Sequence, residues 1–148
     1  MKKKFKKEDI SDISESILNK ISKTKSSKAK VLALSGELGA GKTTLTQELG
    51  RILGIKDKII SPTFVIMKIY DIDKKSEYYS SFKKLIHIDA YRLESKEELF
   101  KIGWTDLNDD KDNLIIIEWP EKVEGALDDG SHFVKLEHVD EETRVLEF

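Results

Sequence analysis

Apolar residues recur at intervals of three and four positions in two segments of the chain. In residues 9–21 they fall on one helical face, made by Ile10, Ile13, Ile17, Leu18 and Ile21. The same spacing returns in residues 43–53, and Gly54 follows as a stop signal. A short helix is expected over residues 95–101, with Ser95 as its cap and Gly103 after its end. The sequence therefore predicts three helices, two from their apolar spacing and a short third one from its capping signals.

Short apolar runs of strand length alternate with these helices. Residues 30–35 and 114–118 are apolar on both faces, which is typical of inner parallel strands covered by helices. Residues 64–70 and 85–89 are two further expected strands, joined by a lysine- and serine-rich segment expected to be a flexible connection. Two last apolar segments, with a polar turn at residues 140–142 between them, predict an antiparallel hairpin at the sheet edge.

This order of elements predicts an α/β protein with a three-layer P-loop NTPase fold. We expect a mainly parallel central sheet, a C-terminal antiparallel hairpin and a single domain over residues 1–148. The chain has 26 basic and 28 acidic residues, so no global basic field argues for nucleic-acid binding and any RNA contact has to be local.

Targeting and redox signals are absent from the sequence. It has no cysteine, which excludes disulfides and thiolate metal sites and suits a reducing cytoplasm. No run of eighteen apolar residues occurs, so we expect a cytoplasmic protein without membrane contact. The basic run in residues 2–7 is interpreted as a solvated, partly frayed terminus.

A glycine-rich segment between the strand at 30–35 and the helix at 43–53 has the pattern G-x-x-x-x-G-K-T. Its glycines allow successive backbone amides to point at phosphate oxygens, and the helix that follows adds its positive end. Lys42 would reach the terminal phosphates and Thr43 would ligate Mg²⁺. We therefore expect ATP and Mg²⁺ as ligands, with nucleotide contacts from Gly39, Ala40, Gly41, Lys42, Thr43 and Thr44.

Carboxylates end two of the expected strands. Asp89 follows the apolar run of residues 85–88, and Glu118 follows that of residues 114–117. Leaving such a charge buried and unpaired costs about several kcal/mol, and ligands of parallel sheets sit outside the carboxyl ends of the strands. Both residues are therefore candidate Mg²⁺ ligands and, with Lys42, the candidate catalytic residues. Which of them orients the attacking water is open.

Four other residues, Thr63, His87, Trp104 and Trp119, have a functional or a structural interpretation. Thr63 could sense a γ-phosphate as a switch threonine does, or it is a structural turn residue. His87 should point to the same side of its strand as Asp89, and a buried, hydrogen-bonded histidine is the favoured interpretation. Trp119 could stack on a base or cover the site, and core packing explains it equally well. Trp104 is expected to be a packing residue.

Several motifs together resemble the TsaE (YjeE) family of small bacterial ATPases. The resemblance covers essentially the whole chain, and the strand-end pair with its Trp-Pro dipeptide is more specific than the phosphate loop. The segments that carry it are Gly36-Glu37-Leu38-Gly39-Ala40-Gly41-Lys42-Thr43-Thr44, Ser61-Pro62-Thr63-Phe64, His87-Ile88-Asp89-Ala90-Tyr91-Arg92-Leu93 and Ile117-Glu118-Trp119-Pro120-Glu121.

The resemblance implies a Mg²⁺-dependent ATPase, weak when alone, that works with the TsaB and TsaD proteins. Those proteins make the threonylcarbamoyl modification on adenosine 37 of tRNAs that read codons beginning with adenine. The family member is not the transferase, and its contact with tRNA would be indirect. By matching positions, Lys42 and Thr43 would hold phosphate and Mg²⁺, Glu118 would be a Mg²⁺ ligand or orient water, and Asp89 and Trp119 would be required for function.

Three other functions compete with a switch-like ATPase. A small-molecule or nucleoside kinase usually carries several arginines on a lid, but the chain has only Arg51, Arg92 and Arg144. A GTPase is disfavoured because no Asn-Lys-x-Asp segment occurs to recognise guanine. A nucleotide-gated binding module without turnover fits the same loop.

Overall fold

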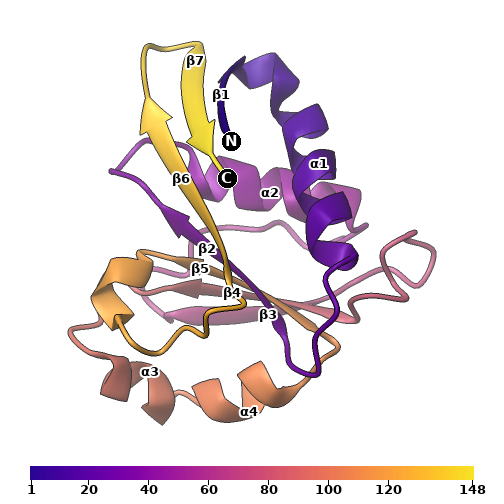
Figure 1. Cartoon of the computed structure of the whole chain (residues 1–148), viewed down its shortest axis with the longest axis vertical. Coiled ribbons are helices and arrows are strands. Elements are labelled where there is room, and N and C mark those ends of the chain that lie inside the picture. The colour runs from indigo at the N-terminus through magenta and orange to yellow at the C-terminus, as the bar shows by residue number, and fades with distance from the viewer.

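The computed structural model describes residues 1–148 and has a twisted sheet between two layers of helices (Figure 1). The strands are β1 (Lys2–Lys6), β2 (Lys30–Ser35), β3 (Met67–Asp71), β4 (Lys84–Asp89), β5 (Asn113–Glu118), β6 (His132–His138) and β7 (Thr143–Glu147). The α-helices are α1 (Ile10–Ser22), α2 (Lys42–Ile52), α3 (Lys96–Lys101) and α4 (Trp104–Asp109). Two short 3₁₀ helices are η1 (Lys7–Asp9) and η2 (Pro120–Val123).

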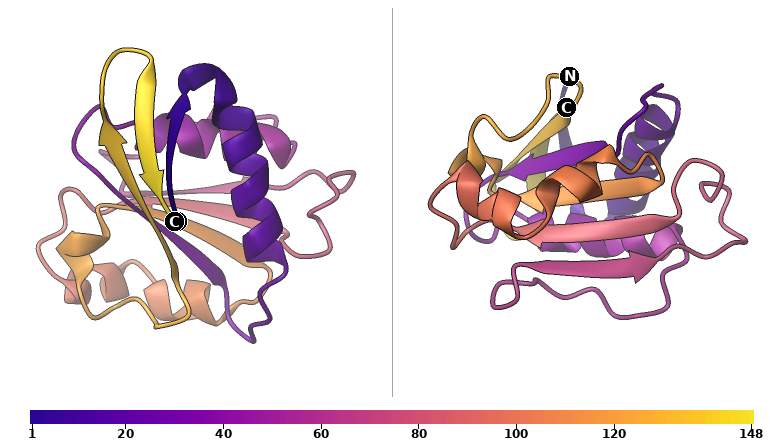
Figure 2. Two further views of the ribbon diagram at one scale, coloured as in Figure 1. Left: turned by 45° about the horizontal axis from the view of Figure 1, so that its top comes forward. Right: turned by 90° about the horizontal axis from the view of Figure 1, so that it is seen from below.

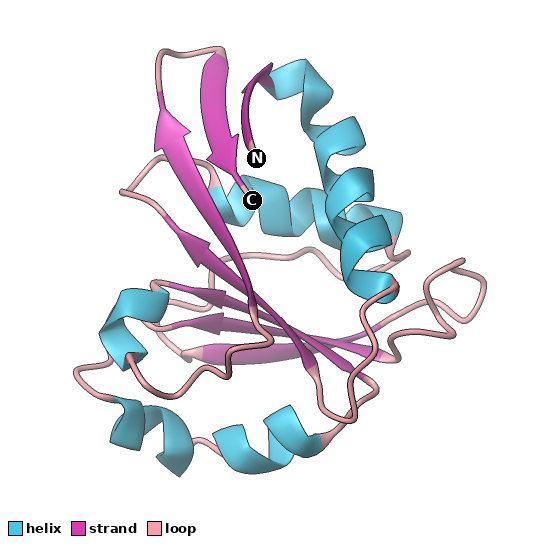
Figure 3. Ribbon diagram, in the orientation of Figure 1, coloured by secondary structure: helices cyan, strands magenta, loops and turns pink.

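The seven strands form one mixed sheet in the order β1-β7-β6-β2-β5-β4-β3. The four inner strands β6, β2, β5 and β4 run parallel to one another, whereas β3 pairs antiparallel with β4, and β7 pairs antiparallel with both β6 and β1 (Figure 3). This confirms the expected α/β fold with a mainly parallel centre and a C-terminal hairpin. The hairpin is not at the edge, however, because β1 lies outside β7.

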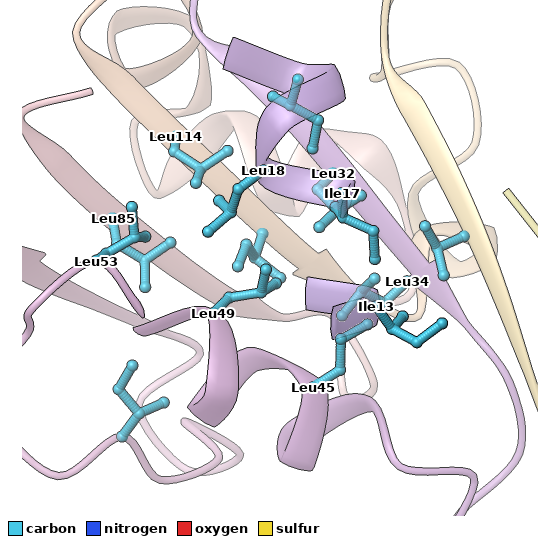
Figure 4. Packing of buried hydrophobic residues seen from close by; sticks show 14 of the residues in the cluster. Ile13, Ile17, Leu18, Leu32, Leu34, Leu45, Leu49, Leu53, Leu85 and Leu114 are labelled. Atoms are coloured by element: carbon cyan, nitrogen blue, oxygen red, sulfur yellow. The ribbon is translucent and has the colours of Figure 1, made fainter. Parts of the chain in front are cut away.

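Two apolar cores hold the three layers together. The larger lies between the sheet and helices α1 and α2, where Leu18, Leu32 and Leu49 are fully buried (Figure 4). The smaller lies on the opposite face, where Ile115, Ile117 and Trp104 pack beneath α3 and α4. Alternate residues of β5 thus enter different cores, which explains why that strand is apolar throughout. None of the helices has the length and apolar character needed to cross a membrane.

The N-terminal basic run differs from the frayed terminus expected. Residues Lys2–Lys6 form β1, which pairs with β7 along its whole length (Figure 2). Phe5 is buried in the larger core while the lysines stay exposed. Burial of Phe5 and pairing with the free edge of β7 both stabilise a segment whose composition favours solvent.

Three other expectations also need correction. Strand β3 begins at Met67, three residues later than expected, because residues 63–65 form a turn. Ser95 precedes α3 but its hydroxyl makes no capping hydrogen bond; the Glu98 carboxylate instead accepts from the Glu94 amide at 2.6 Å. The segment between β3 and β4, expected to be flexible, is anchored by Tyr78 and Phe82 in the larger core.

Candidate functional site

The glycine-rich segment connects β2 to the first turn of α2. Gly36 and Gly41 have φ angles of 144° and 105°, a backbone region that side chains rarely adopt. Gly41 lies at the start of α2, where its carbonyl accepts the amide of Leu45 at 2.9 Å. The amides at the start of this eleven-residue helix are free to donate outward, which is the arrangement that binds phosphate.

Gly36 also fits where no side chain could. A Cβ at this position would overlap the backbone carbonyl of Leu136 on β6. Replacing Gly36 by Ala should lower the free energy of unfolding by about 2 kcal/mol or more, because it adds backbone strain to a close contact. Chemical denaturation measures this change. Gly130→Ala is the matched control, since a Cβ there meets nothing and its φ is ordinary, and equal stability of the two variants would refute the packing argument.

Lys42 is folded back over the loop and is only 5% exposed. Its ammonium donates to the carbonyl oxygens of Gly36 and Glu37 and lies 4.2 Å from the centre of the Trp119 ring. Burial lowers the pKa of Lys42 below its ordinary value. Three carboxylates oppose this shift, those of Glu118, Glu121 and Asp89. The Lys42 ammonium is therefore held at the loop, close enough to these three carboxylates to interact with their charges.

Thr43 and Glu118 face each other across the start of α2. The Thr43 hydroxyl donates to Glu118 Oε1 at 3.3 Å, and Nε2 of His87 lies 2.6 Å from Glu118 Oε2. Glu118 is 3% exposed and His87 is fully buried. The predicted strand-end carboxylate is thus held in place by one residue from the phosphate loop and one from β4. The expectation of a buried, hydrogen-bonded His87 is confirmed for one of its two ring nitrogens.

Asp89 is the centre of a second hydrogen-bonded group. Its Oδ2 accepts from the hydroxyls of Ser61 and Thr63, each at 3.1 Å, and its Oδ1 accepts from the Tyr91 amide at 3.0 Å. Asp89 and Glu118 are neighbours in the parallel pairing of β4 with β5. Thr63 thus belongs to the turn at residues 63–65 and also contacts Asp89, on the wall of the cavity that Glu118 shares.

Trp119 joins these groups to the loop. It follows β5 with φ and ψ of 60° and 51°, a left-handed conformation that is unusual for a large residue. Its ring lies 5.1 Å from that of Tyr91, and its amide donates to the carbonyl of Leu34 at 3.2 Å. Trp119 is half-buried: it packs against the smaller core, and its ring also lies beside the Lys42 ammonium.

One cavity of about 390 Å³ brings nearly all of the predicted residues together. Those that line it are Gly39, Gly41, Lys42, Thr43, Thr44, Thr63, Asp89, Glu118 and Trp119. Ala40 does not, because its side chain is buried in the larger core. A wider cavity of about 700 Å³ lies on the other side of the loop, but Lys42, Asp89 and Glu118 are absent from its walls.

Sequence reasoning did not select five residues that line the same cavity: Lys7, Leu38, Ser61, Tyr91 and Arg144. Ser61 and Tyr91 stand inside the quoted motifs, and their neighbours Thr63 and Asp89 could have pointed to them. Lys7 and Arg144 come from opposite ends of the chain, and the pairing of β1 with β7 brings them to the site. No local pattern marks either one.

The donor set suits Mg²⁺. No group of three or more His, Asp and Glu side chains is arranged to hold a metal ion. Mg²⁺ commonly keeps several waters and takes only one or two carboxylates together with phosphate oxygens. The Thr43 hydroxyl and the Glu118 carboxylate supply such oxygens on one wall of the cavity, and Asp89 is the next strand-end carboxylate.

The sheet, the glycine-rich loop and the helix that follows it define an α/β protein of the P-loop class. A family model described as threonylcarbamoyl adenosine biosynthesis protein TsaE matches residues 6–146. The chain therefore belongs to the TsaE family.

Individual relatives agree with this assignment. The tRNA threonylcarbamoyladenosine biosynthesis protein TsaE of Haemophilus influenzae is 36% identical over 114 residues, which are 77% of this chain and 66% of the relative. The protein of the same name from Streptomyces coelicolor is 41% identical over 103 residues, 67% of this chain and 63% of the relative. The matches thus span slightly less than two thirds of these relatives.

A solved structure is similar over nearly the whole chain. The crystal structure of YdiB from Bacillus subtilis superposes with a TM-score of 0.68 at 23% identity, covering 99% of this chain and 83% of that one. At this level of identity the likeness supports the fold.

Proposed function

We propose that this chain binds and hydrolyses ATP with Mg²⁺ and thereby serves the threonylcarbamoyladenosine modification of tRNA. The observation that carries the proposal is the contact of the Thr43 hydroxyl with Glu118, 3.3 Å apart, in the same cavity as Lys42. A hydroxyl that begins a P-loop helix and a strand-end carboxylate are the pair that holds Mg²⁺ in P-loop NTPases. The family description and the names of the relatives support the pathway.

Each residue has a role that its surroundings support. Lys42 and the amides of residues 39–43 would bind the phosphates, and Lys42 is already held at the loop. Thr43 and Glu118 would hold Mg²⁺, which supplies positive charge to the γ-phosphate when bound. Glu118 also lines the cavity, where its carboxylate can orient a water for in-line attack. Trp119 would limit the access of other water to Lys42.

Asp89 and Thr63 fit a role in sensing rather than in attack. Both oxygens of Asp89 are occupied by donors, and two of those donors come from the loop before β3. A change at the phosphate end of the cavity would reach that loop through Thr63. We therefore propose that the loop at residues 61–66 changes conformation with nucleotide state and that this change is what the TsaB and TsaD proteins detect.

The test is phosphate release from ATP with Mg²⁺, measured with the chain alone and then with TsaB and TsaD added. We expect slow hydrolysis by the chain alone and a higher rate with both partners present. Samples that contain only TsaB and TsaD give the background. The tRNA of cells depleted of the chain should at the same time lose the modified nucleoside, which mass spectrometry of digested tRNA detects.

Other outcomes would select a different function. Transfer of labelled γ-phosphate to a small acceptor would indicate a kinase. ATP binding without hydrolysis under either condition would indicate a nucleotide-gated module. Neither binding nor hydrolysis would reject the proposal as a whole.

A further inference from the structure

His87 is a fully buried histidine in contact with the candidate catalytic carboxylate. Its Nε2 lies 2.6 Å from Glu118 Oε2, and the two side chains are 0% and 4% exposed. Glu118 has one other hydrogen-bonding partner, the Thr43 hydroxyl, on its second oxygen. The carboxylate is therefore fixed between one donor from β4 and one from the phosphate loop.

The surroundings of His87 define its tautomer. A carboxylate oxygen only accepts hydrogen bonds, so the proton of this contact is on Nε2. Nδ1 is buried and has no partner, and a proton placed there would be a buried donor without an acceptor. Of the two tautomers, the one with hydrogen on Nε2 leaves no buried donor unpaired.

The position of His87 makes it a support for Glu118 rather than a part of the cavity wall. It is two residues before Asp89 on β4 and points to the same side of the sheet, but it does not line the cavity that Glu118, Asp89 and Lys42 share. A buried carboxylate that lost this donor would be free to turn its Oε2 toward another partner. Supporting hydrogen bonds of this kind keep a ligand in one orientation.

We propose that His87 is a positioning residue that fixes the rotamer of Glu118, so that Oε1 faces Thr43 and the cavity. The proposal rests on the proposed ATP hydrolysis for its kinetic consequence. Its structural content, the Nε2–H donor to Glu118, stands on the geometry of the free protein.

Two variants separate positioning from packing. His87→Leu keeps most of the buried volume but removes the donor, and His87→Gln restores an N–H near the place of Nε2. We expect His87→Leu to lower kcat by about 10- to 100-fold while the Kd for ATP is unchanged, the usual effect of losing a supporting hydrogen bond. His87→Gln should recover most of kcat. Melting temperatures without nucleotide show whether each variant is folded under the assay conditions.

A nitrogen NMR spectrum of the free protein tests the contact without any activity. The chain has three histidines, so the His87 signals are identified by their absence in His87→Gln. We expect the shifts of a ring with hydrogen on Nε2 and not on Nδ1, and a change in these shifts in Glu118→Gln. A Nδ1–H tautomer, or His87 nitrogen shifts that are the same in Glu118→Gln as in the unmodified chain, would overturn the proposal whether or not the protein hydrolyses ATP.

The kinetic outcomes are equally distinct. If kcat is unchanged in His87→Leu, His87 is only a packing residue. The same holds if kcat falls in both variants in proportion to their loss of melting temperature. If the unmodified chain shows no hydrolysis even with partners, the proposed function fails, and the NMR result still decides whether His87 positions Glu118.

Discussion

Lys42→Met should bind ATP about 10- to 100-fold more weakly than the unmodified chain. A charged hydrogen bond contributes about 1.5–3 kcal/mol, and each 1.36 kcal/mol is tenfold in affinity. Methionine keeps an unbranched apolar stem but removes the ammonium that lies over Trp119, so the loss reports on the charge. Calorimetric titration with ATP and Mg²⁺ measures the effect, and the melting temperature without nucleotide shows whether the loop still folds.

Lys111→Met is the control for this variant. Lys111 is exposed on the turn before β5, at the opposite end of that strand from Glu118, and its charge is remote from the cavity. We expect its ATP affinity to equal that of the unmodified chain. If Lys42→Met also kept full affinity and lost only thermal stability, Lys42 would be a structural residue that caps the carbonyls of Gly36 and Glu37.

The parts of the site that sequence could predict are those encoded locally. The glycine-rich loop is recognised because an apolar strand precedes it and a periodic helix follows it within a few residues. Asp89 and Glu118 stand out because each ends an apolar run, where burying a charge without a partner costs free energy. Their direct pairing on adjacent strands confirms that both carboxylates come to one edge of the sheet.

The parts that sequence could not predict depend on distant pairings. Lys7 and Arg144 reach the cavity because β1 pairs with β7. Lysine has low β-propensity, so the sequence of β1 does not predict a strand there. The contact of His87 with Glu118 depends on the order of β4 and β5 in the sheet, which periodicity does not determine. Helix α4 has only six residues, too few for a periodic pattern to identify.

The two strand-end carboxylates also differ in a way that only the structure reveals. Both oxygens of Asp89 accept hydrogen bonds from the protein, at 3.0 and 3.1 Å. Glu118 Oε1 has only the longer contact with Thr43, at 3.3 Å. The sequence left open which residue orients water, and this difference favours Glu118, because a group committed to three donors has little freedom to bind a further ligand.

Glu118→Gln should therefore lower kcat by about 100- to 1000-fold, within the range expected for loss of a positioned base, with at most a small change in the Kd for ATP. Glutamine keeps the size of the side chain and removes its charge, so binding through the loop and Lys42 remains. Single-turnover hydrolysis in the presence of TsaB and TsaD gives the rate, and titration with ATP gives the affinity.

Two further variants make that result specific. Glu121→Gln removes a neighbouring exposed carboxylate that also raises the pKa of Lys42 but does not line the cavity. This variant should keep nearly the full rate of hydrolysis. Asp89→Asn should reduce the rate less than Glu118→Gln, because Asp89 mainly holds Ser61 and Thr63. The reverse order would transfer the water-orienting role to Asp89. An equal loss of affinity and rate in Glu118→Gln would mean that this carboxylate chiefly maintains the structure around Thr43 and His87.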